Sequence, residues 1–89
     1  MEIITKRIKE NIPFDLINQL WEMYYAGYPK NTEKDHYQFF KIEQTKITMW
    51  QEIPKQKKVI DYQNEHQSEA EIWIIDDGEV HTMLFPEDY

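Results

Sequence analysis

Cysteine is absent from this sequence of 89 residues, and glycine occurs only twice, at Gly27 and Gly78. Without cysteine the chain has no disulfide, no thiol nucleophile and no thiolate metal ligand. Two glycines are also too few for a glycine-rich phosphate-binding loop. Because small secreted domains usually depend on disulfides, we expect a cytoplasmic protein.

Long hydrophobic runs are also missing. Uninterrupted apolar stretches, such as Ile72–Ile75 and Met83–Phe85, are at most four residues long, far below the ~20 residues that a membrane-spanning helix needs. The first residues lack the apolar segment of a signal peptide. Hydrophobic residues nevertheless make up 40% of the chain and aromatic ones 15%. We therefore expect one folded domain over residues 1–89, with no membrane partner.

Positive charge is absent from the last third of the chain. Residues 61–89 hold nine acids and no Lys or Arg, whereas residues 1–60 hold all 10 basic residues and eight acids. This acidic segment repels phosphate groups, so nucleic acid is not an expected partner. The acids can simply keep the protein soluble. The separation of charge also favours self-association, or a partner of mixed charge.

The clearest pattern is that of an amphipathic helix, in which apolar residues recur every three or four positions. The apolar stripe comprises Phe14, Ile17, Leu20, Trp21, Tyr24, Tyr25 and Tyr28. Pro13 suits the first helical position, and Asp15 in the first turn complements the helix dipole. Gly27 and Pro29 are typical of residues that end a helix. The sequence thus predicts one helix of about 14 residues.

Alternating patterns predict strands on either side of this helix. Ile3–Ile8 favours a short first strand. His36–Glu43 and Ile47–Ile53 read as a hairpin joined by a turn at residues 44–46, and Pro54 ends it. Residues 59–62 are compatible with a further short strand or a loop. The polar residues 63–69 are expected to be the most mobile part of the chain.

A second hairpin is indicated by Asp77-Gly78 between two apolar runs, because both central residues of a type I′ turn need a positive φ. With a two-residue turn, Ile75 would face Val80. The two faces of this hairpin would then carry Trp73, Ile75, Val80, Thr82 and Leu84 on one side, and Ile72, Ile74, His81, Met83 and Phe85 on the other. Because both faces are apolar, both need cover.

The predicted fold is therefore α+β: an antiparallel sheet of four to five strands with one amphipathic helix packed on one face. The strands come from two hairpins and a short N-terminal strand. One helix cannot cover both faces, so residues 54–70 or another chain must shield the second face. We expect Tyr37, Phe39, Trp50 and Trp73 to contact a partner there. The alternative is that some of these rings only lie over their own sheet.

No motif in the sequence indicates catalysis. Ser68 is the only serine, and no nucleophile motif surrounds it. The histidines, His36, His66 and His81, do not stand at metal-ligand spacing. We therefore assign no catalytic, metal-binding or cofactor-binding residue, and expect a protein that is not an enzyme. A further hypothesis is a small-ligand binder or enzyme that uses His81 with a neighbouring carboxylate, Asp76 or Glu79.

Several short segments resemble one known family, the domain-of-unknown-function family number 960, first noted in staphylococcal proteins and found in Gram-positive bacteria and their mobile elements. The segments are Thr5–Arg7, Ile12–Pro13, Leu20–Trp21, Tyr37–Phe40, Gln51–Pro54, Ile75–Gly78, Thr82–Leu84 and the terminal Glu87–Tyr89. Phe85-Pro86 departs from the small residues typical of the family at that point. The resemblance implies an α+β fold, and it implies no activity and no catalytic residues.

Together these observations predict a small cytoplasmic interaction module without catalytic function. It would bind a protein partner or a second copy of itself through the aromatic face of its sheet, as a homodimer in the second case. The alternative suggested by the charge of residues 61–89 is an acidic mimic, carried by a mobile element, that inhibits a basic nucleic-acid-binding partner.

Overall fold

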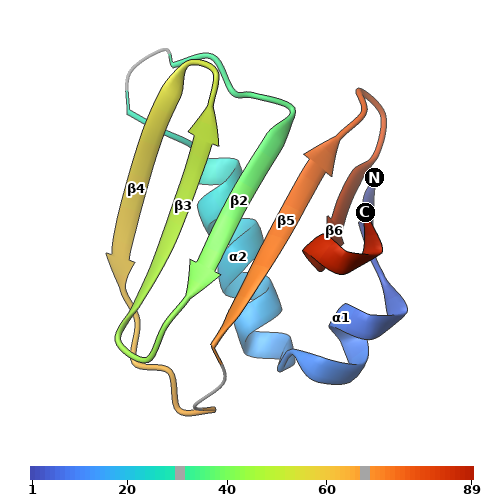
Figure 1. Ribbon diagram of the computed structural model, residues 1–89, viewed down its shortest axis with the longest axis vertical. Helices are drawn as coiled ribbons and strands as arrows, with labels where there is room; N and C mark the ends of the chain where they lie inside the picture. The colour runs from blue at the N-terminus through green and yellow to red at the C-terminus, as the bar shows by residue number, and fades with distance from the viewer. Residues whose placement is uncertain (30–31, 67–68) are drawn as a thin grey trace.

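Six strands form a single sheet in the computed structural model, which describes residues 1–29, 32–66 and 69–89 (Figure 1). The elements are β1 (Glu2–Ile4), α1 (Lys6–Asn11), α2 (Phe14–Ala26), β2 (Tyr37–Ile42), β3 (Lys46–Glu52), β4 (Lys55–Asp61), β5 (Ala70–Asp76), β6 (His81–Leu84) and the 3-10 turn η1 (Pro86–Asp88). The expected long helix is thus present, as α2.

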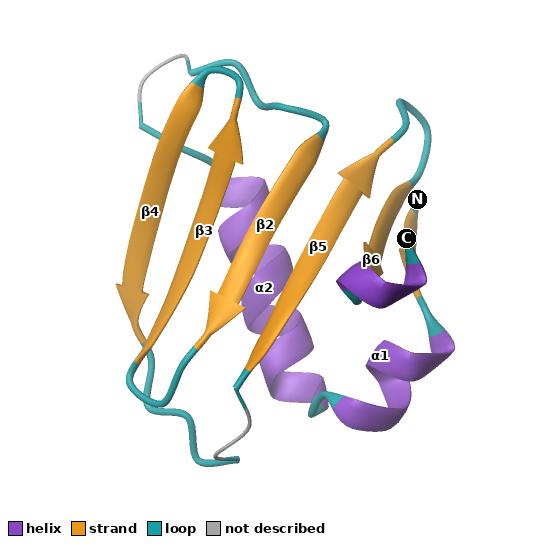
Figure 2. Ribbon diagram, viewed as in Figure 1, coloured by secondary structure: helices purple, strands orange, loops and turns teal. Residues whose placement is uncertain are grey.

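The order of the strands across the sheet is β1-β6-β5-β2-β3-β4. All neighbours are antiparallel except β1 and β6, which are parallel. The predicted α+β class is confirmed, but the prediction of four to five antiparallel strands is wrong, since the sheet has six strands and is mixed. The helix α2 runs behind one face and leaves the other face open to the viewer (Figure 2). No helix in the described ranges is long and apolar enough to cross a membrane.

The first strand is shorter than expected, because the chain turns into α1 after Ile4. Thr5 caps this helix: its hydroxyl accepts a hydrogen bond from the backbone N–H of Ile8 at 3.4 Å. Ile8 is completely buried beneath the helix. The prediction of a strand over Ile3–Ile8 is therefore wrong for its second half, where the apolar spacing of four positions between Ile4 and Ile8 belongs to a helical turn.

Residues 55–61 widen the sheet instead of covering it. A two-residue turn at Ile53-Pro54, which contains a cis peptide bond, joins β3 to β4, and Glu52 pairs with Lys55. The expectation that residues 54–70 or another chain shield the open face is not met by β4, because this strand lies within the sheet. Within the polar segment expected to be mobile, Gln67 and Ser68 lie outside the described residues.

The hairpin between β5 and β6 has a longer loop than the predicted two residues, and Ile75 pairs with Thr82 instead of Val80. Asp77 holds this loop: its side-chain oxygen Oδ1 accepts from the N–H of Val80 at 2.9 Å. Gly78 provides a φ of 102°. The register differs from the expected one by two positions, an even number, so each side chain stays on its predicted face.

The core lies between α2 and the face of the sheet behind which it runs. Fully buried side chains from the strands include Phe40, Ile42, Ile47, Met49, Ile72, Ile74 and Met83. Leu16, Leu20 and Tyr24 meet them from the helix and are 0–1% exposed. This contact uses the alternate positions of each strand, so the intervening side chains are left on the opposite face.

Two buried glutamines close one end of this core. The Tyr28 hydroxyl donates to Gln38 Oε1 at 2.7 Å, and Gln38 Nε2 donates to Gln51 Oε1 at 2.7 Å. Gln51 Nε2 in turn donates to the carbonyl oxygens of Glu33 and Pro54, at 2.9 and 2.8 Å. Gln51 is 1% exposed. Its side chain therefore fastens both the loop before β2 and the turn before β4 to the sheet.

Replacing Gln51 should destabilise the fold strongly. Gln51→Met keeps the volume of the side chain but leaves the carbonyls of Glu33 and Pro54 and the N–H of Asp35 without this partner. It also removes one of the two hydrogen bonds that Gln38 Nε2 donates. At ~1–3 kcal/mol for each buried group left unsatisfied, we expect a loss of ~2–4 kcal/mol in the free energy of unfolding. Urea denaturation measures it. The exposed Gln63→Met is the control, and an equal effect of the two substitutions would contradict the role given to Gln51.

Candidate functional site

The open face of the sheet carries a row of aromatic rings. Phe39 pairs with Trp50 on one side and with Trp73 on the other, so β2, β3 and β5 present these rings side by side. Tyr37 stands two positions before Phe39 on the same face. The structure therefore brings together all four residues proposed from the sequence as partner contacts. Contact with a partner itself stays a prediction.

These rings pack against one another as well as against the sheet. The ring centroids of Phe39 and Trp73 lie 5.2 Å apart in an edge-to-face arrangement, and those of Phe39 and Trp50 lie 5.5 Å apart. Tyr37 stacks on Phe39 at 6.5 Å. Each ring is half-buried, without help from α2. The alternative, that the rings only lie over their own sheet, is thus correct for part of each ring. The outer edges of the rings remain exposed.

A fifth ring, Tyr89, joins this row and was not predicted. The turn η1 folds the end of the chain onto the open face, where the Tyr89 hydroxyl lies 2.6 Å from the Tyr37 hydroxyl and its ring 5.5 Å from that of Trp73. Arg7 holds the turn in place through an ion pair with Asp88 at 2.8 Å. Tyr89 itself is 69% exposed. We call these five residues, Tyr37, Phe39, Trp50, Trp73 and Tyr89, the aromatic face.

Charged side chains of opposite sign flank the aromatic face. On β4, Lys57 lies beside Trp50, and Lys55 lies two positions before it. On β5, the Glu71 carboxylate accepts a hydrogen bond from Trp73 Nε1 at 2.9 Å. The acids of η1, Glu87 and Asp88, stand on the same side as Glu71. The open face is thus mainly basic at β4 and acidic from β5 onward.

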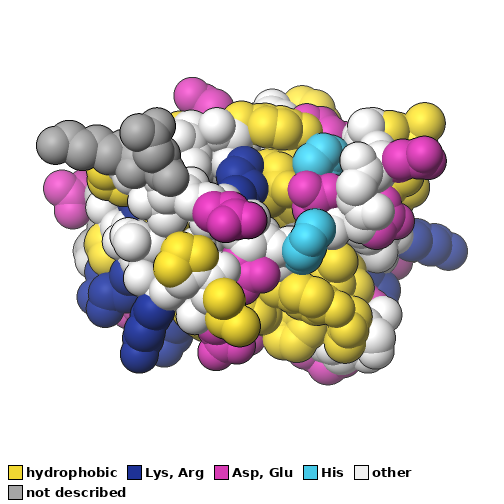
Figure 3. Space-filling view, turned by 90° about the horizontal axis from the view of Figure 1, so that it is seen from above, with side chains coloured by type: hydrophobic (Ala, Val, Ile, Leu, Met, Phe, Trp, Pro, Cys, Tyr) yellow, Lys and Arg dark blue, Asp and Glu magenta, His cyan; other side chains and the backbone are white. Residues whose placement is uncertain are grey.

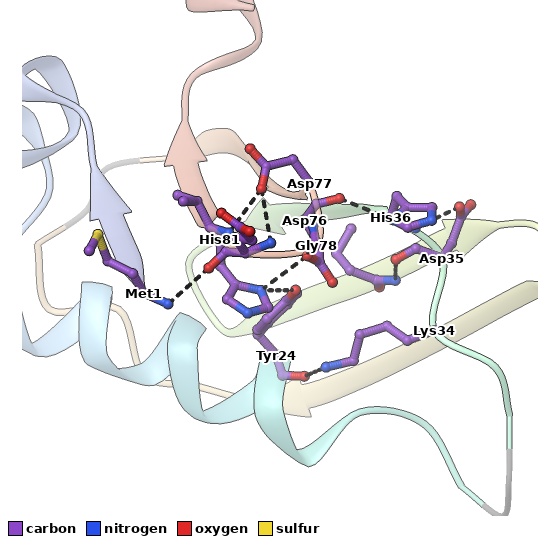
Figure 4. A network of polar contacts seen from close by, with 12 residues as sticks. Met1, Tyr24, Lys34, Asp35, His36, Asp76, Asp77, Gly78 and His81 are labelled. Atoms are coloured by element: carbon purple, nitrogen blue, oxygen red, sulfur yellow. Dashed lines mark hydrogen bonds and ion pairs between the residues drawn. The ribbon is translucent and has the colours of Figure 1, made fainter.

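A second polar cluster lies on the helix side, at the end of β5 and β6 (Figure 4). The Tyr24 hydroxyl lies 2.7 Å from His81 Nδ1, and an Asp76 oxygen lies 3.8 Å from the same nitrogen. The Lys34 ammonium donates to the Tyr24 backbone carbonyl at 2.7 Å and sits 4.0 Å from the centre of its ring. Burial raises the pKa of Tyr24, and the nearby charge of Asp76 adds to the effect. Burial conversely lowers the pKa of Lys34.

This cluster connects elements of the fold. Tyr24 is 1% exposed, and its bond to His81 ties α2 to β6. Three surface cavities, of about 180, 300 and 290 Å³, lie elsewhere, and His81 lines none of them. In the part of the chain that the structure describes, no group of three or more His, Asp or Glu is placed to hold a metal ion. The hypothesis of a ligand-binding or catalytic His81 gains no support from this geometry.

The end of the molecule that carries this cluster is seen in Figure 3. Histidine and acidic side chains reach the surface there, next to a patch of hydrophobic side chains. His36, the residue before β2, also belongs to this end, since its Nδ1 lies 3.0 Å from the backbone oxygen of Asp76. Sequence reasoning missed the bond between Tyr24 and His81, because it joins a helix to a strand 57 positions later.

The buried tyrosines should set an upper pH limit to folding. Burial raises the pKa of both Tyr24 and Tyr28, while in the unfolded chain each titrates near the ordinary value of about 10. The unfolded state therefore ionises first, and the stability present at neutral pH falls as the pH rises above about 10. We expect part of the tyrosinate absorbance to appear only together with the loss of the circular-dichroism signal. Complete tyrosine titration in a chain that keeps its native spectrum would contradict this assignment.

Comparison with known proteins supports the fold. A family model described as "Staphylococcal protein of unknown function (DUF960)" matches residues 2–88, which confirms the resemblance drawn from the sequence motifs. A crystal structure of a protein of unknown function from Enterococcus faecalis is similar, with a TM-score of 0.83 and 17% identity over 99% of this chain and 89% of the other. At that identity the likeness concerns the fold alone. No curated protein matches the chain.

Proposed function

The chain belongs to the DUF960 family, and we propose that it is a small non-catalytic interaction module of the cytoplasm that associates with a second copy of itself through the aromatic face. The observation that carries this proposal is the row of five rings on the side of the sheet opposite α2. Trp and Tyr are enriched at the centres of protein interfaces, where they bury large areas at low entropic cost.

The cover that one copy provides for this face is incomplete. The turn η1 reaches one corner, over Trp73 and Tyr37, and Tyr89 in this turn remains largely exposed. The far side, where Trp50 lies next to β4, has no element above it in the described residues. A contiguous apolar surface of this kind is typical of sites that contact another protein.

The distribution of charge favours a second copy as the partner. If a two-fold axis runs parallel to the strands between two facing sheets, the β4 side of one copy lies over the β5 and η1 side of the other. Lys55 and Lys57 then lie over the half of the partner copy that carries β5, β6 and η1, whose acids include Glu71 on β5 and Glu87, the second already in contact with Arg7. Both halves of such an interface are complementary, and the rings meet at its centre.

The competing proposal, an acidic mimic of nucleic acid, has less geometric support. A mimic would present its carboxylates in a row, as a phosphate backbone does. The acids of residues 61–89 instead divide between the two ends of β5, with Glu71 at one end and Asp77 and Glu79 at the other. Asp88 is paired with Arg7. The spread of the described acids suits a solvated surface better than such a row.

Removing one ring from the centre of the aromatic face should weaken the dimer. We expect the wild-type protein to show, by size-exclusion chromatography with light scattering, twice the mass of one 11.0 kDa chain. Trp73→Ala and Trp50→Ala should each raise the dissociation constant by about fivefold or more, since interface anchors contribute more than ~1 kcal/mol. The matched control is Phe14→Ala, which removes a ring that is 73% exposed on α2, away from this face.

The dimer is excluded if the wild-type protein remains an 11.0 kDa species at high micromolar concentration. Equal dissociation constants for the two tryptophan variants and the Phe14→Ala control would instead remove the aromatic face from the interface. Circular dichroism of each variant confirms that the fold is retained, so a change in mass cannot be attributed to unfolding.

A further inference from the structure

The outer side of β4 is the second unpartnered feature of the sheet. β4 forms one edge, and among the strands the structure describes only β3 pairs with it. Two backbone hydrogen bonds show to which neighbouring strand each residue of β3 directs its N–H and C=O groups. Glu43 N–H donates to the Lys46 carbonyl in the β2–β3 hairpin, and Tyr62 N–H donates to the Thr45 carbonyl beyond the β3–β4 pair, both at 3.0 Å. Thr45 thus faces β4, and Lys46 faces β2.

In an antiparallel sheet, successive residues of a strand direct their backbone groups to opposite sides. The side that each further residue of β3 and β4 faces follows from this rule. Met49 faces β4, so its partner Lys58 directs its N–H and C=O groups inward to β3. Lys57 and Val59 direct theirs outward, away from the sheet. Val59 is also 49% exposed. The free edge therefore offers a short row of unpaired donors and acceptors to an extended chain.

Lysines make this edge selective. β4 carries Lys55, Lys57 and Lys58 against a single acid, Asp61, in a chain whose net charge is −7. Antiparallel pairing of two β4 strands about a two-fold axis at Lys58 would place Lys58 opposite Lys58 and Lys57 opposite Val59, and only Lys55 would meet an acid, Asp61. The same charges attract a strand with acidic side chains.

A cavity adjoins the edge on its helix side. Its volume is about 300 Å³, and its lining consists of Ala26, Gly27, Tyr28, Pro29, Lys57 and Lys58. The Lys58 ammonium is already engaged, since it donates to the Gly27 carbonyl at 3.0 Å at the end of α2. Lys58 therefore presents mainly its hydrocarbon stem to the cavity. An aliphatic side chain from a strand lying along β4 would fit this lining.

We propose that the β4 edge binds an extended acidic segment of another protein, which adds to the sheet as a seventh strand. Its backbone would pair with the outward groups of Lys57 and Val59. Its acidic side chains would lie on the open-face side near Lys55 and Lys57, and an alternate aliphatic side chain would enter the cavity. Backbone pairing supplies affinity in this mode of recognition, while alternate side chains supply specificity. The outward backbone groups of Lys57 and Val59 point away from the aromatic face, but the ammonium groups of Lys55 and Lys57 border it. A second copy on the aromatic face should therefore compete with the peptide for these two charges.

A labelled heptapeptide in which glutamate alternates with valine tests the charge requirement by fluorescence anisotropy. The full chain should bind this peptide more tightly at low salt than at high salt, and should not bind the same peptide with lysine in place of glutamate. Lys57→Glu should weaken binding by about tenfold or more. Lys6→Glu, which makes the same charge change on α1 at a side chain 86% exposed, should leave binding unchanged.

Hydrogen exchange tests whether the peptide pairs with the backbone. In the free protein the amides of Lys57 and Val59 should exchange rapidly and those of Lys58 and Ile60 slowly, and the peptide should slow the first pair only. Val59→Pro removes an outward N–H that is not used in the β3–β4 ladder, so the fold should persist while peptide binding is lost. Val59→Thr keeps the N–H and should keep the binding.

Three binding results would overturn the proposal: no binding of the glutamate peptide at about 1 mM, equal binding of the lysine peptide, or tighter binding of a single-stranded oligothymidylate. Peptide binding without slower exchange at Lys57 and Val59 would also overturn it, because charge attraction alone would then explain the contact. Trp73→Ala should dissociate the dimer and retain the peptide, whereas Val59→Pro should do the reverse. The two variants therefore distinguish an error in the proposed dimer from an error in the proposed peptide site.

Discussion

A single helix packed on one side of a wide sheet is the constraint from which most of this structure follows. The 13 residues of α2 rise about 20 Å, enough to cover one face diagonally and none of the other. Apolar residues at alternate strand positions meet the helix, and the positions between them face outward. When those outward positions hold Phe39, Trp50 and Trp73, the rings have only each other, and the chain end at Tyr89, as cover.

Much of this arrangement could be predicted from the sequence, because the assignment of faces depends on alternation and not on exact pairing. The β5–β6 register was wrong by two positions, yet Ile74 and Met83 still face the helix and Trp73 and Leu84 still face outward. The carboxylate of Asp77, which binds backbone N–H groups across the loop, made the turn longer than its Asp-Gly pair indicated. That contact depends on side-chain geometry, which periodicity does not contain.

The missed features depend on contacts between distant parts of the chain. The start of α1 was taken for strand because Ile3, Ile4 and Ile8 fit both periods, and only the Thr5 cap and the burial of Ile8 decide between them. Lys55–Asp61 pairs with β3 although its own pattern of alternate exposed and half-buried residues is weakly apolar. The position of Tyr89 was missed for the same reason. Pro86 followed by two acids is typical of a helical turn, but the packing of this turn on the sheet depends on Arg7, which is 81 positions away from Asp88.

The strand order explains how a separation of charge along the sequence becomes a separation in space. Residues 70–88 form β5, β6 and η1, which occupy one half of the molecule, while β3 and β4, from the basic part of the chain, occupy the other. The separation is partial, because α1 packs beside β6 and its Arg7 contacts Glu87 and Asp88. The strand β2 lies between β5 and β3, so Phe39 stands at the boundary between the two halves of the sheet. A surface that is apolar at its centre and of opposite sign at its two sides is complementary to a rotated copy of itself. The β4 edge, by contrast, carries three lysines and one acid, which favours an acidic strand, so the edge and the face select different partners.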